Sequence, residues 1–331
     1  MDFLHRTVRD FLETKDIYQQ LEERAGAHVF EPRRSLCRAF VGMLKALPLQ
    51  KTGTQDQDRF FRGRLNDIFS IVDEFNFYAR QCEERAKKEA KETKVSEMAI
   101  ETLYTTEIEL IDEVDRVLCS YAAQCGIKEH WTNLRDPPAG LYQEYRQKTY
   151  MASVIQARLH IYVSHKLSAD HHLIAQKKCR PLLDYALRPA MITPVQLPPY
   201  DANISVEMVT ILLSYGTNPN QKIFAYDSQT VWQLFLLSCL ELLERRAYDA
   251  SCKSAWYEAM ILMLRHGAGP NCTVVKIGER QEAGKTLWDV ADACFIGDQL
   301  NKLRALIKEK QGGRLGELSR YILGWTGWGP A

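Results

Sequence analysis

The sequence has almost no net charge. Its 331 residues carry 43 Lys and Arg against 42 Asp and Glu, which leaves a formal charge of +1 at neutral pH. A balanced chain has no overall field that would attract nucleic acid or anionic lipid, so we expect neither as a partner. An RNA-binding helical-repeat protein stays an alternative, because it would need a basic face that a balanced total does not indicate.

Long apolar runs are also lacking. No stretch approaches the roughly 18 apolar residues that span a bilayer, and His5, Arg6 and Arg9 stand where a signal peptide would need its apolar segment. We therefore expect a cytoplasmic protein that does not enter a membrane. The composition, 46% hydrophobic and 26% charged, is that of a globular protein long enough for two or three structural units.

Paired cysteines are missing from a chain that has nine of them. The number is odd and no C-x-x-C pair occurs, so the spacing predicts neither a disulfide framework nor a zinc ribbon. We expect most of them to be reduced core residues. They are Cys37, Cys82, Cys119, Cys125, Cys179, Cys239, Cys252, Cys272 and Cys294.

Catalytic signatures are missing as well. The sequence has no G-x-S-x-G, no H-E-x-x-H and no paired carboxylates in a recognisable context. We therefore predict that the chain is not an enzyme and that it has no catalytic, cofactor-binding or metal-binding residues. Two weaker patterns leave alternatives open.

The first is the segment from Gly278 to Thr286, which ends in Gly-Lys-Thr as a P-loop does. A P-loop has four residues between its glycines, because a fixed turn aims its N–H groups at phosphate, and this chain has five. The alternative prediction is that Lys285 binds a nucleotide phosphate in a distorted P-loop.

The second pattern is a group of four histidines that could surround zinc with Cys179. No H-x-x-x-H pair or second cysteine supports a zinc site, so we expect these histidines to lie on helix surfaces. They are His160, His165, His171 and His172.

Apolar residues recur with helical spacing along most of the chain, which predicts an all-α fold. We expect Ser35 to cap one helix, Gly126 to end another, and residues 51–58 to form a loop. The charged run of residues 83–94 should prolong its helix into solvent, with Glu83 and Lys87 at the favourable i to i+4 spacing. The expected helices cover residues 4–12, 16–25, 35–47, 60–78, 100–121, 152–167, 181–189 and 299–310.

Two stretches resemble the second helix and exit turn of an ankyrin repeat. They are residues 206–220 and 257–271, in which Gly216 and Gly267 stand where the chain must leave a helix in the left-handed conformation. Residues 227–234 and 284–291 resemble the opening of the following repeat. The two glycines are 51 positions apart, against 33 in a regular repeat, so the resemblance implies stretched, degenerate copies.

The N-terminal segment carries a second resemblance. Residues 3–12 read F-x-H-x-T-x-x-D-F-L, and residues 30–47 continue with F-x-P-x-x-S-L-C-R-A and a later L-K-x-L. Both phrases resemble the end of the winged-helix region, and the region after it, that follow the NACHT ATPase in fungal STAND proteins. The resemblance implies a sensor or regulatory role for helical surfaces that bind protein, while the ATPase itself is absent from this chain.

Together these patterns predict four parts. Residues 1–30 would be a remnant of the winged-helix end, residues 31–140 a helical domain, residues 141–312 degenerate ankyrin-like repeats and residues 313–331 a flexible tail. We expect a non-catalytic protein-interaction or regulatory module with an unidentified protein partner. The apolar face of residues 4–12 also predicts self-association.

Overall fold

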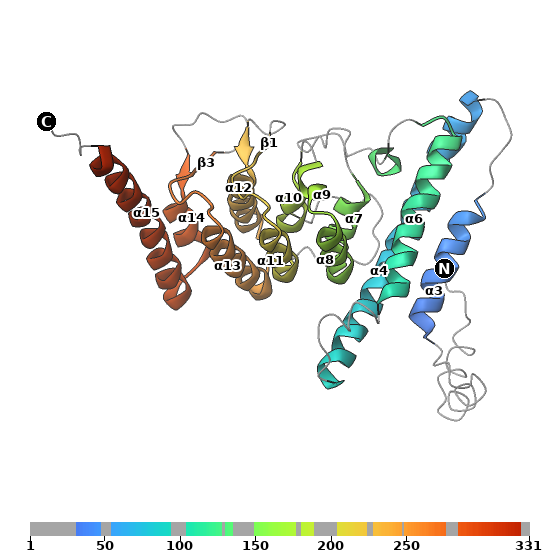
Figure 1. The fold of residues 1–331 in the computed structure, drawn as a ribbon, viewed down its shortest axis with the longest axis horizontal. Helices are drawn as coiled ribbons and strands as arrows, with labels where there is room; N and C mark the ends of the chain where they lie inside the picture. Colours follow the sequence, from blue (N-terminus) through green and yellow to red (C-terminus); the bar gives the residue numbers. More distant parts are fainter. Residues whose placement is uncertain are drawn as a thin grey trace, which may run out of the picture.

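The structure is a computed structural model in which twelve α-helices can be described, and it confirms the all-α fold (Figure 1). It describes residues 31–47, 54–93, 104–127, 130–134, 149–176, 180–188, 204–223, 228–246, 248–275 and 284–325. One continuous apolar core runs from Cys37 in the first described helix to Ile307 in the last. Within the described residues, a unit of three helices is followed by a stack of helices.

The three-helix unit consists of α3 (Pro32–Lys45), α4 (Thr54–Thr93) and α6 (Thr105–Gln124). Residues Ile68, Val72, Phe75 and Ala79 recur on one face of α4 and are buried against the other two helices. The hydroxyl of Tyr104, which lies just before α6, donates to the carbonyl of Ala79 at 2.9 Å. A 3₁₀ helix, η1 (Trp131–Leu134), follows α6 and contacts it.

The stack has two rows of helices, which we call the first row and the second row. Contacts run along each row and between the two rows (Figure 1). The first row contains α7 (Tyr150–Gln156), α10 (Leu182–Leu187), α12 (Val231–Glu244) and α14 (Leu287–Cys294). The second row contains α8 (His160–Ala169), α11 (Val206–Ser214), α13 (Ala250–Arg265) and α15 (Gly297–Trp325), and α9 (His172–Gln176) follows α8.

Two short β-hairpins join the second row to the first. Strand β1 (Lys222–Ile223) pairs antiparallel with β2 (Gln229–Thr230), and β3 (Thr273–Val274) pairs antiparallel with β4 (Lys285–Thr286). Both hairpins lie along one edge of the stack (Figure 1), which we call the hairpin edge. The order second-row helix, hairpin, first-row helix therefore occurs twice.

A buried group of charges lies at both ends of α10 in the first row. The carboxylate of Asp184 is fully buried and accepts hydrogen bonds from Arg180 Nε at 2.5 Å and from Arg188 Nε and Nη2 at 2.7 and 2.6 Å. Burial by itself would raise the pKa of Asp184, but the two arginines lower it overall, so the carboxylate stays ionised. Pairing of this kind is what makes a buried charge tolerable.

Two helices begin earlier than the sequence predicts. Helix α3 starts at Pro32 with Glu31 at the N-cap position, so the predicted cap Ser35 lies inside the helix. Proline suits the first helical position, because the N–H that it lacks would have no helical partner there. Residues 54–58, predicted as a loop, form the start of α4.

Residues 152–167, predicted as one helix, form two. Helix α7 ends where Arg158 adopts a left-handed conformation with φ of 61°, and its N–H donates to the carbonyl of Ile155 at 3.0 Å. The N–H of Leu159 then bonds to the carbonyl of Val154 at 3.1 Å, which completes a Schellman-type end. A non-glycine residue in this position leaves no signal in the sequence, and the prediction of one helix is wrong.

Two further details differ. Pro181, predicted at the first position of α10, is its N-cap residue. Helix α15, predicted to end near Lys310, continues through Gly312 and Gly313 to Trp325, because a glycine lowers helix stability by only about 1 kcal/mol. The predicted helices at 4–12 and 16–25 and the Pro-rich segments near 136–140 and 189–199 lie outside the described residues.

Candidate functional site on the hairpin edge

Each hairpin follows a glycine at the end of the preceding helix. Gly216 has φ of +86° and Gly267 has φ of +89°, as the sequence predicts for the residue that leaves the helix. After each glycine, the next N–H reaches back five residues: the N–H of Thr217 bonds to the carbonyl of Leu212 at 3.1 Å, and the same pattern follows Gly267. Both second-row helices therefore end in a Schellman motif that turns the chain towards the hairpin edge.

Each hairpin ends at a threonine that caps the following helix. The Thr230 hydroxyl accepts the N–H of Gln233, whose side chain accepts the N–H of Thr230 in return. Thr286 and Asp289 form the same reciprocal capping box at the start of α14. The threonines also occupy the last positions of strands β2 and β4, so hairpin and helix are joined with no intervening residue.

The two hairpins are fastened to each other through Asn220. Its Oδ1 accepts the N–H of Gly269 at 2.9 Å, and its Nδ2 donates to the carbonyl of Gly267 at 2.7 Å. Trp232, fully buried at the start of α12, donates its indole N–H to the carbonyl of Gly269 at 3.1 Å. Side chains of the first hairpin unit thus satisfy backbone groups in the exit turn of the second.

Two glutamines extend this connection along the strands. The Gln229 amide donates to the carbonyl of Val275 at 2.9 Å, and the Gln233 amide donates to the carbonyl of Thr273 at 2.8 Å. Because side-chain amides fix the distance between consecutive backbones, the hairpins are held at a set spacing. The described residues Lys222, Thr273 and Lys285 remain exposed on this edge, where a partner could contact them.

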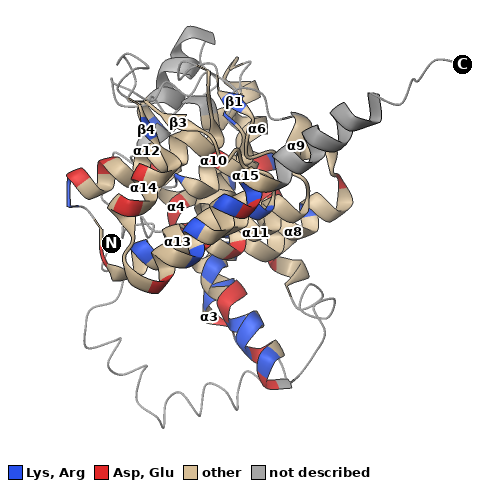
Figure 2. Cartoon of the chain, turned by 90° about the vertical axis from the view of Figure 1, so that its left-hand side faces the viewer, with Lys and Arg blue, Asp and Glu red and all other residues tan. Residues whose placement is uncertain are grey.

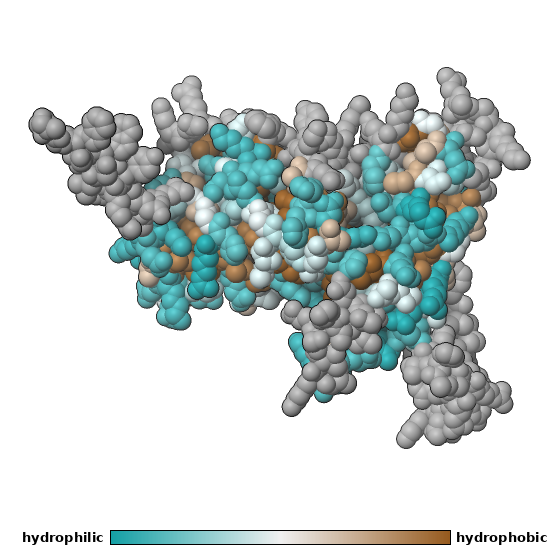
Figure 3. Space-filling model, in the orientation of Figure 1, coloured by the Kyte–Doolittle hydropathy of each residue, from teal (hydrophilic) through white to brown (hydrophobic). Residues whose placement is uncertain are grey.

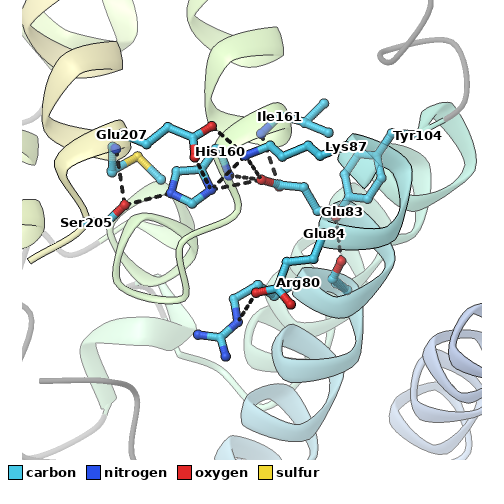
Figure 4. Close-up of polar contacts among 11 residues, drawn as sticks. Arg80, Glu83, Glu84, Lys87, Tyr104, His160, Ile161, Ser205 and Glu207 are labelled. Atoms are coloured by element: carbon cyan, nitrogen blue, oxygen red, sulfur yellow. Dashed lines mark hydrogen bonds and ion pairs between the residues drawn. The ribbon is translucent and has the colours of Figure 1, made fainter. Parts of the chain in front are cut away.

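A second polar cluster joins the three-helix unit to the stack (Figure 4). The Glu83 carboxylate on α4 is 1% exposed and accepts the backbone N–H groups of His160 and Ile161, each at 3.1 Å. These are the first two residues of α8, whose N-cap residue Leu159 has no capping side chain. Glu83 thus caps α8 from another helix, where a negative charge is also favoured by the helix dipole.

The cluster continues through His160 to α11. His160 Nδ1 lies 2.9 Å from Glu83, and its Nε2 lies 2.7 Å from the hydroxyl of Ser205, the N-cap of α11 (Figure 4). Lys87 bonds to Glu83 at 2.9 Å and to Glu207 at 2.5 Å. Burial alone would raise the pKa of Glu207, but the hydrogen bond from Lys87 lowers it overall.

Ser205, His160 and Glu83 lie in the order of nucleophile, base and orienting acid in hydrolases. Their other bonds differ, since the Ser205 oxygen also accepts the N–H of Met208 and the Glu83 oxygens accept two N–H groups of α8. His160 is 13% exposed. The geometry therefore supports a structural link between α4, α8 and α11, and the predicted solvated arm is wrong at Glu83, Ala86 and Ala90, which are buried.

The residues of the two weaker sequence patterns fall into other contacts. His171 Nδ1 lies 2.5 Å from the carbonyl of Leu167, and in the part of the chain that the structure describes no metal-type group includes His160, His165, His171 or His172. Cys179 lies outside that part. Lys285 lies in strand β4 and Thr286 in the capping box of α14, while the other residues of the predicted P-loop, apart from Gly284, lie outside the described ranges.

Sequence reasoning missed a group of three metal-type side chains beside η1. Asp115 and Cys119 project from α6 one turn apart, and the nearest polar atoms of Asp115, Cys119 and His130 all lie within 4.8 Å of one another. His130 Nε2 is 3.1 Å from Asp115 Oδ1. Burial alone would lower the pKa of His130, but hydrogen bonds to Asp115 and Cys119 raise it to about 9. The D-x-x-x-C spacing on a helix was the available signal.

The surface has mixed character. On the face drawn in Figure 2, Lys and Arg lie beside Asp and Glu along the helices. In Figure 3, hydrophobic residues of the coloured surface appear in strips between hydrophilic ones. Among the residues that the structure describes, no helix combines the length and apolar character that a membrane crossing requires.

The described residues define an all-α protein whose second half is a two-row helical stack. Residues 1–55 match a family described as a domain of unknown function (DUF7791). This match contains both N-terminal phrases, at 3–12 and 30–47, and helix α3. No curated protein and no solved structure matches the chain.

Proposed function

We propose that the chain is a non-catalytic protein-interaction module whose recognition surface is the hairpin edge. The observation that carries this proposal is the fastening of one hairpin to the next through Asn220, Trp232, Gln229 and Gln233. Loops held at fixed spacing by a rigid scaffold are the usual place for binding residues, because their geometry is set before the partner arrives.

The order of elements supports the finer part of the proposal, that the stack consists of degenerate ankyrin-like repeats. Helix, Schellman glycine, hairpin, threonine cap and helix follow one another at Gly216 and again at Gly267. We propose further that the chain resembles the region after the ATPase in fungal NACHT STAND proteins, with a cytoplasmic location and a sensor or regulatory role. The N-terminal phrases support this part.

The proposal predicts that charge reversal on the hairpin edge abolishes recognition of a protein partner. The test compares proximity labelling in the source cells by the wild-type chain and by a Lys222→Glu, Lys285→Glu variant. Lys88→Glu with Lys308→Glu is the matched control, since these lysines are also exposed but lie on α4 and α15. We expect the wild-type chain and the control to label the same proteins, and the edge variant to lose that labelling. Binding should then be reproduced with the purified partner.

Equal labelling by all three chains would place recognition elsewhere, and labelling of nothing above background would contradict the proposal.

Two alternatives have their own tests. Micromolar ATP binding in calorimetry that Lys285→Ala abolishes would favour the distorted P-loop. Retention of RNA on filters at low salt would favour an RNA-binding repeat surface. Self-association predicts a sedimentation coefficient that rises with protein concentration.

A further inference from the structure

The C-terminal part of α6 carries a group of side chains that protein recognition does not use. Asp115 and Cys119 stand at positions i and i+4, so both project from one face of the helix. His130 comes from the segment between α6 and η1 and meets them. A carboxylate, a thiol and an imidazole therefore converge from two elements on one point.

We propose that Asp115, Cys119 and His130 form a zinc-binding site. Around a tetrahedral zinc, bonds of about 2.0 Å to nitrogen or oxygen and about 2.3 Å to sulfur place nitrogen and oxygen ligands roughly 3.3 Å apart and sulfur and oxygen ligands roughly 3.5 Å apart. In the structure His130 Nε2 is 3.1 Å, and Cys119 Sγ 3.9 Å, from Asp115 Oδ1. Movements of a few tenths of an ångström bring both pairs to ligand spacing.

Neighbouring residues already orient two of the three ligands. The Trp131 indole N–H donates to Asp115 Oδ1 at 2.7 Å, and His130 Nδ1 lies 2.7 Å from the Thr132 hydroxyl. Ligating histidines usually hold their second ring nitrogen in such a hydrogen bond, which fixes the ring while the first nitrogen binds metal. The backbone N–H of Thr132 also approaches Nδ1, at 3.3 Å, and this weaker contact would be given up. Trp131 and Thr132 are themselves buried, so the frame is rigid.

The donor set selects the metal. Thiolate and imidazole ligands suit zinc, whereas calcium and magnesium require oxygen ligands. Three protein ligands leave one position of a tetrahedron for solvent, and solvent reaches the group because the Asp115 and His130 side chains are 34% and 25% exposed.

Zinc at this point would tie η1 to α6. The Trp131 ring packs on Phe69 of α4 and on Tyr150 of α7, with ring centroids 5.6 Å apart in both cases. Trp131 therefore bridges the three-helix unit and the stack. Zinc bound at its side should raise the melting temperature of the whole chain, because binding to the folded state alone stabilises it.

The experiment loads the purified, untagged full chain with Co²⁺, whose bond to a thiolate gives a charge-transfer absorption. We expect one Co²⁺ per chain, displaced by Zn²⁺, and loss of the charge-transfer band in Cys119→Ser. Cys252→Ser is the matched control, since Cys252 is another half-buried cysteine on a helix, and its spectrum should equal that of wild type.

His130→Gln keeps the thiol and provides a second variant if Cys119→Ser fails to fold, as judged by circular dichroism. It should weaken Co²⁺ binding at least tenfold and abolish the rise in melting temperature with Zn²⁺. A wild-type chain that binds no stoichiometric Co²⁺ or Zn²⁺ would overturn the proposal and leave a hydrogen-bonded group only. So would a charge-transfer band that survives in a folded Cys119→Ser variant.

Discussion

Replacing Asp184 by asparagine tests the buried charges of α10. The substitution keeps the shape of the side chain but removes the buried negative charge that the guanidinium groups of Arg180 and Arg188 contact. Asp184 accepts three charge-assisted hydrogen bonds, and one amide oxygen cannot replace them all. Losing two at about 1.5–3 kcal/mol each gives roughly 3–6 kcal/mol, which agrees with about 3–5 kcal/mol for breaking a buried ion pair.

Urea unfolding followed by circular dichroism at the helix band measures the effect, with the midpoint compared at equal m value. Asp298→Asn is the control, because Asp298 pairs with Lys302 at the same i to i+4 spacing but is 78% exposed. It should leave the midpoint nearly unchanged, since exposed pairs contribute little. If Asp184→Asn unfolds at the same urea concentration as Asp298→Asn, the argument from buried charge is refuted.

Three other predictions concern the stability of the fold. Gly267→Ala should lower the free energy of unfolding by about 1–2 kcal/mol, because φ is +89° there. Gly42→Ala, inside α3, should raise the free energy of unfolding by about 0.5–1 kcal/mol. Neither added Cβ meets another atom, so the urea midpoints of the two variants report the backbone effect alone. Asn220→Ala removes two hydrogen bonds between the hairpins and should cost about 1–3 kcal/mol, with faster hydrogen exchange at the Gly269 amide than in wild type. The pKa of Glu207 is lowered in the folded state, so the stabilisation that its charge gives is complete above the unfolded pKa of about 4.3 and is lost as the pH falls further. The free energy of unfolding between about pH 3 and 6 should therefore depend less on pH in Glu207→Gln than in wild type. Equal slopes of the free energy of unfolding against pH in the two proteins would contradict this.

Local signals account for the parts of the fold that the sequence predicts correctly. The exit turns at Gly216 and Gly267 were predictable because a helix that ends in a left-handed residue favours glycine, and both have positive φ. Gly126 ends α6 for the same reason. The break at Arg158 was not predictable, because there an arginine takes the conformation that glycine usually supplies.

In the candidate site, too, local features could be predicted from the sequence and long-range contacts could not. Each hairpin unit could be predicted from its own glycine and threonine, but the bonds from Asn220 to Gly267 and Gly269 could not, since they join residues 47 and 49 positions apart. The convergence of His130 on Asp115 and Cys119 depends on how the chain returns to α6 after the helix ends. Spacing along one helix indicates two of these three ligands, and only the tertiary fold supplies the third.

Glu83 shows why a charge pattern by itself could not predict the connection between the two halves. On α4 it begins a run of charged residues, which by local rules predicts a solvated helix. A carboxylate can nevertheless be buried where hydrogen-bond donors are available to it, and the N-terminus of any helix offers N–H groups that lack a helical partner. Here those donors belong to His160 and Ile161, 77 and 78 positions away. The first turn of α8 therefore depends on α4. Glu83→Gln should weaken the contact between the three-helix unit and the stack more than it weakens the folding of either unit.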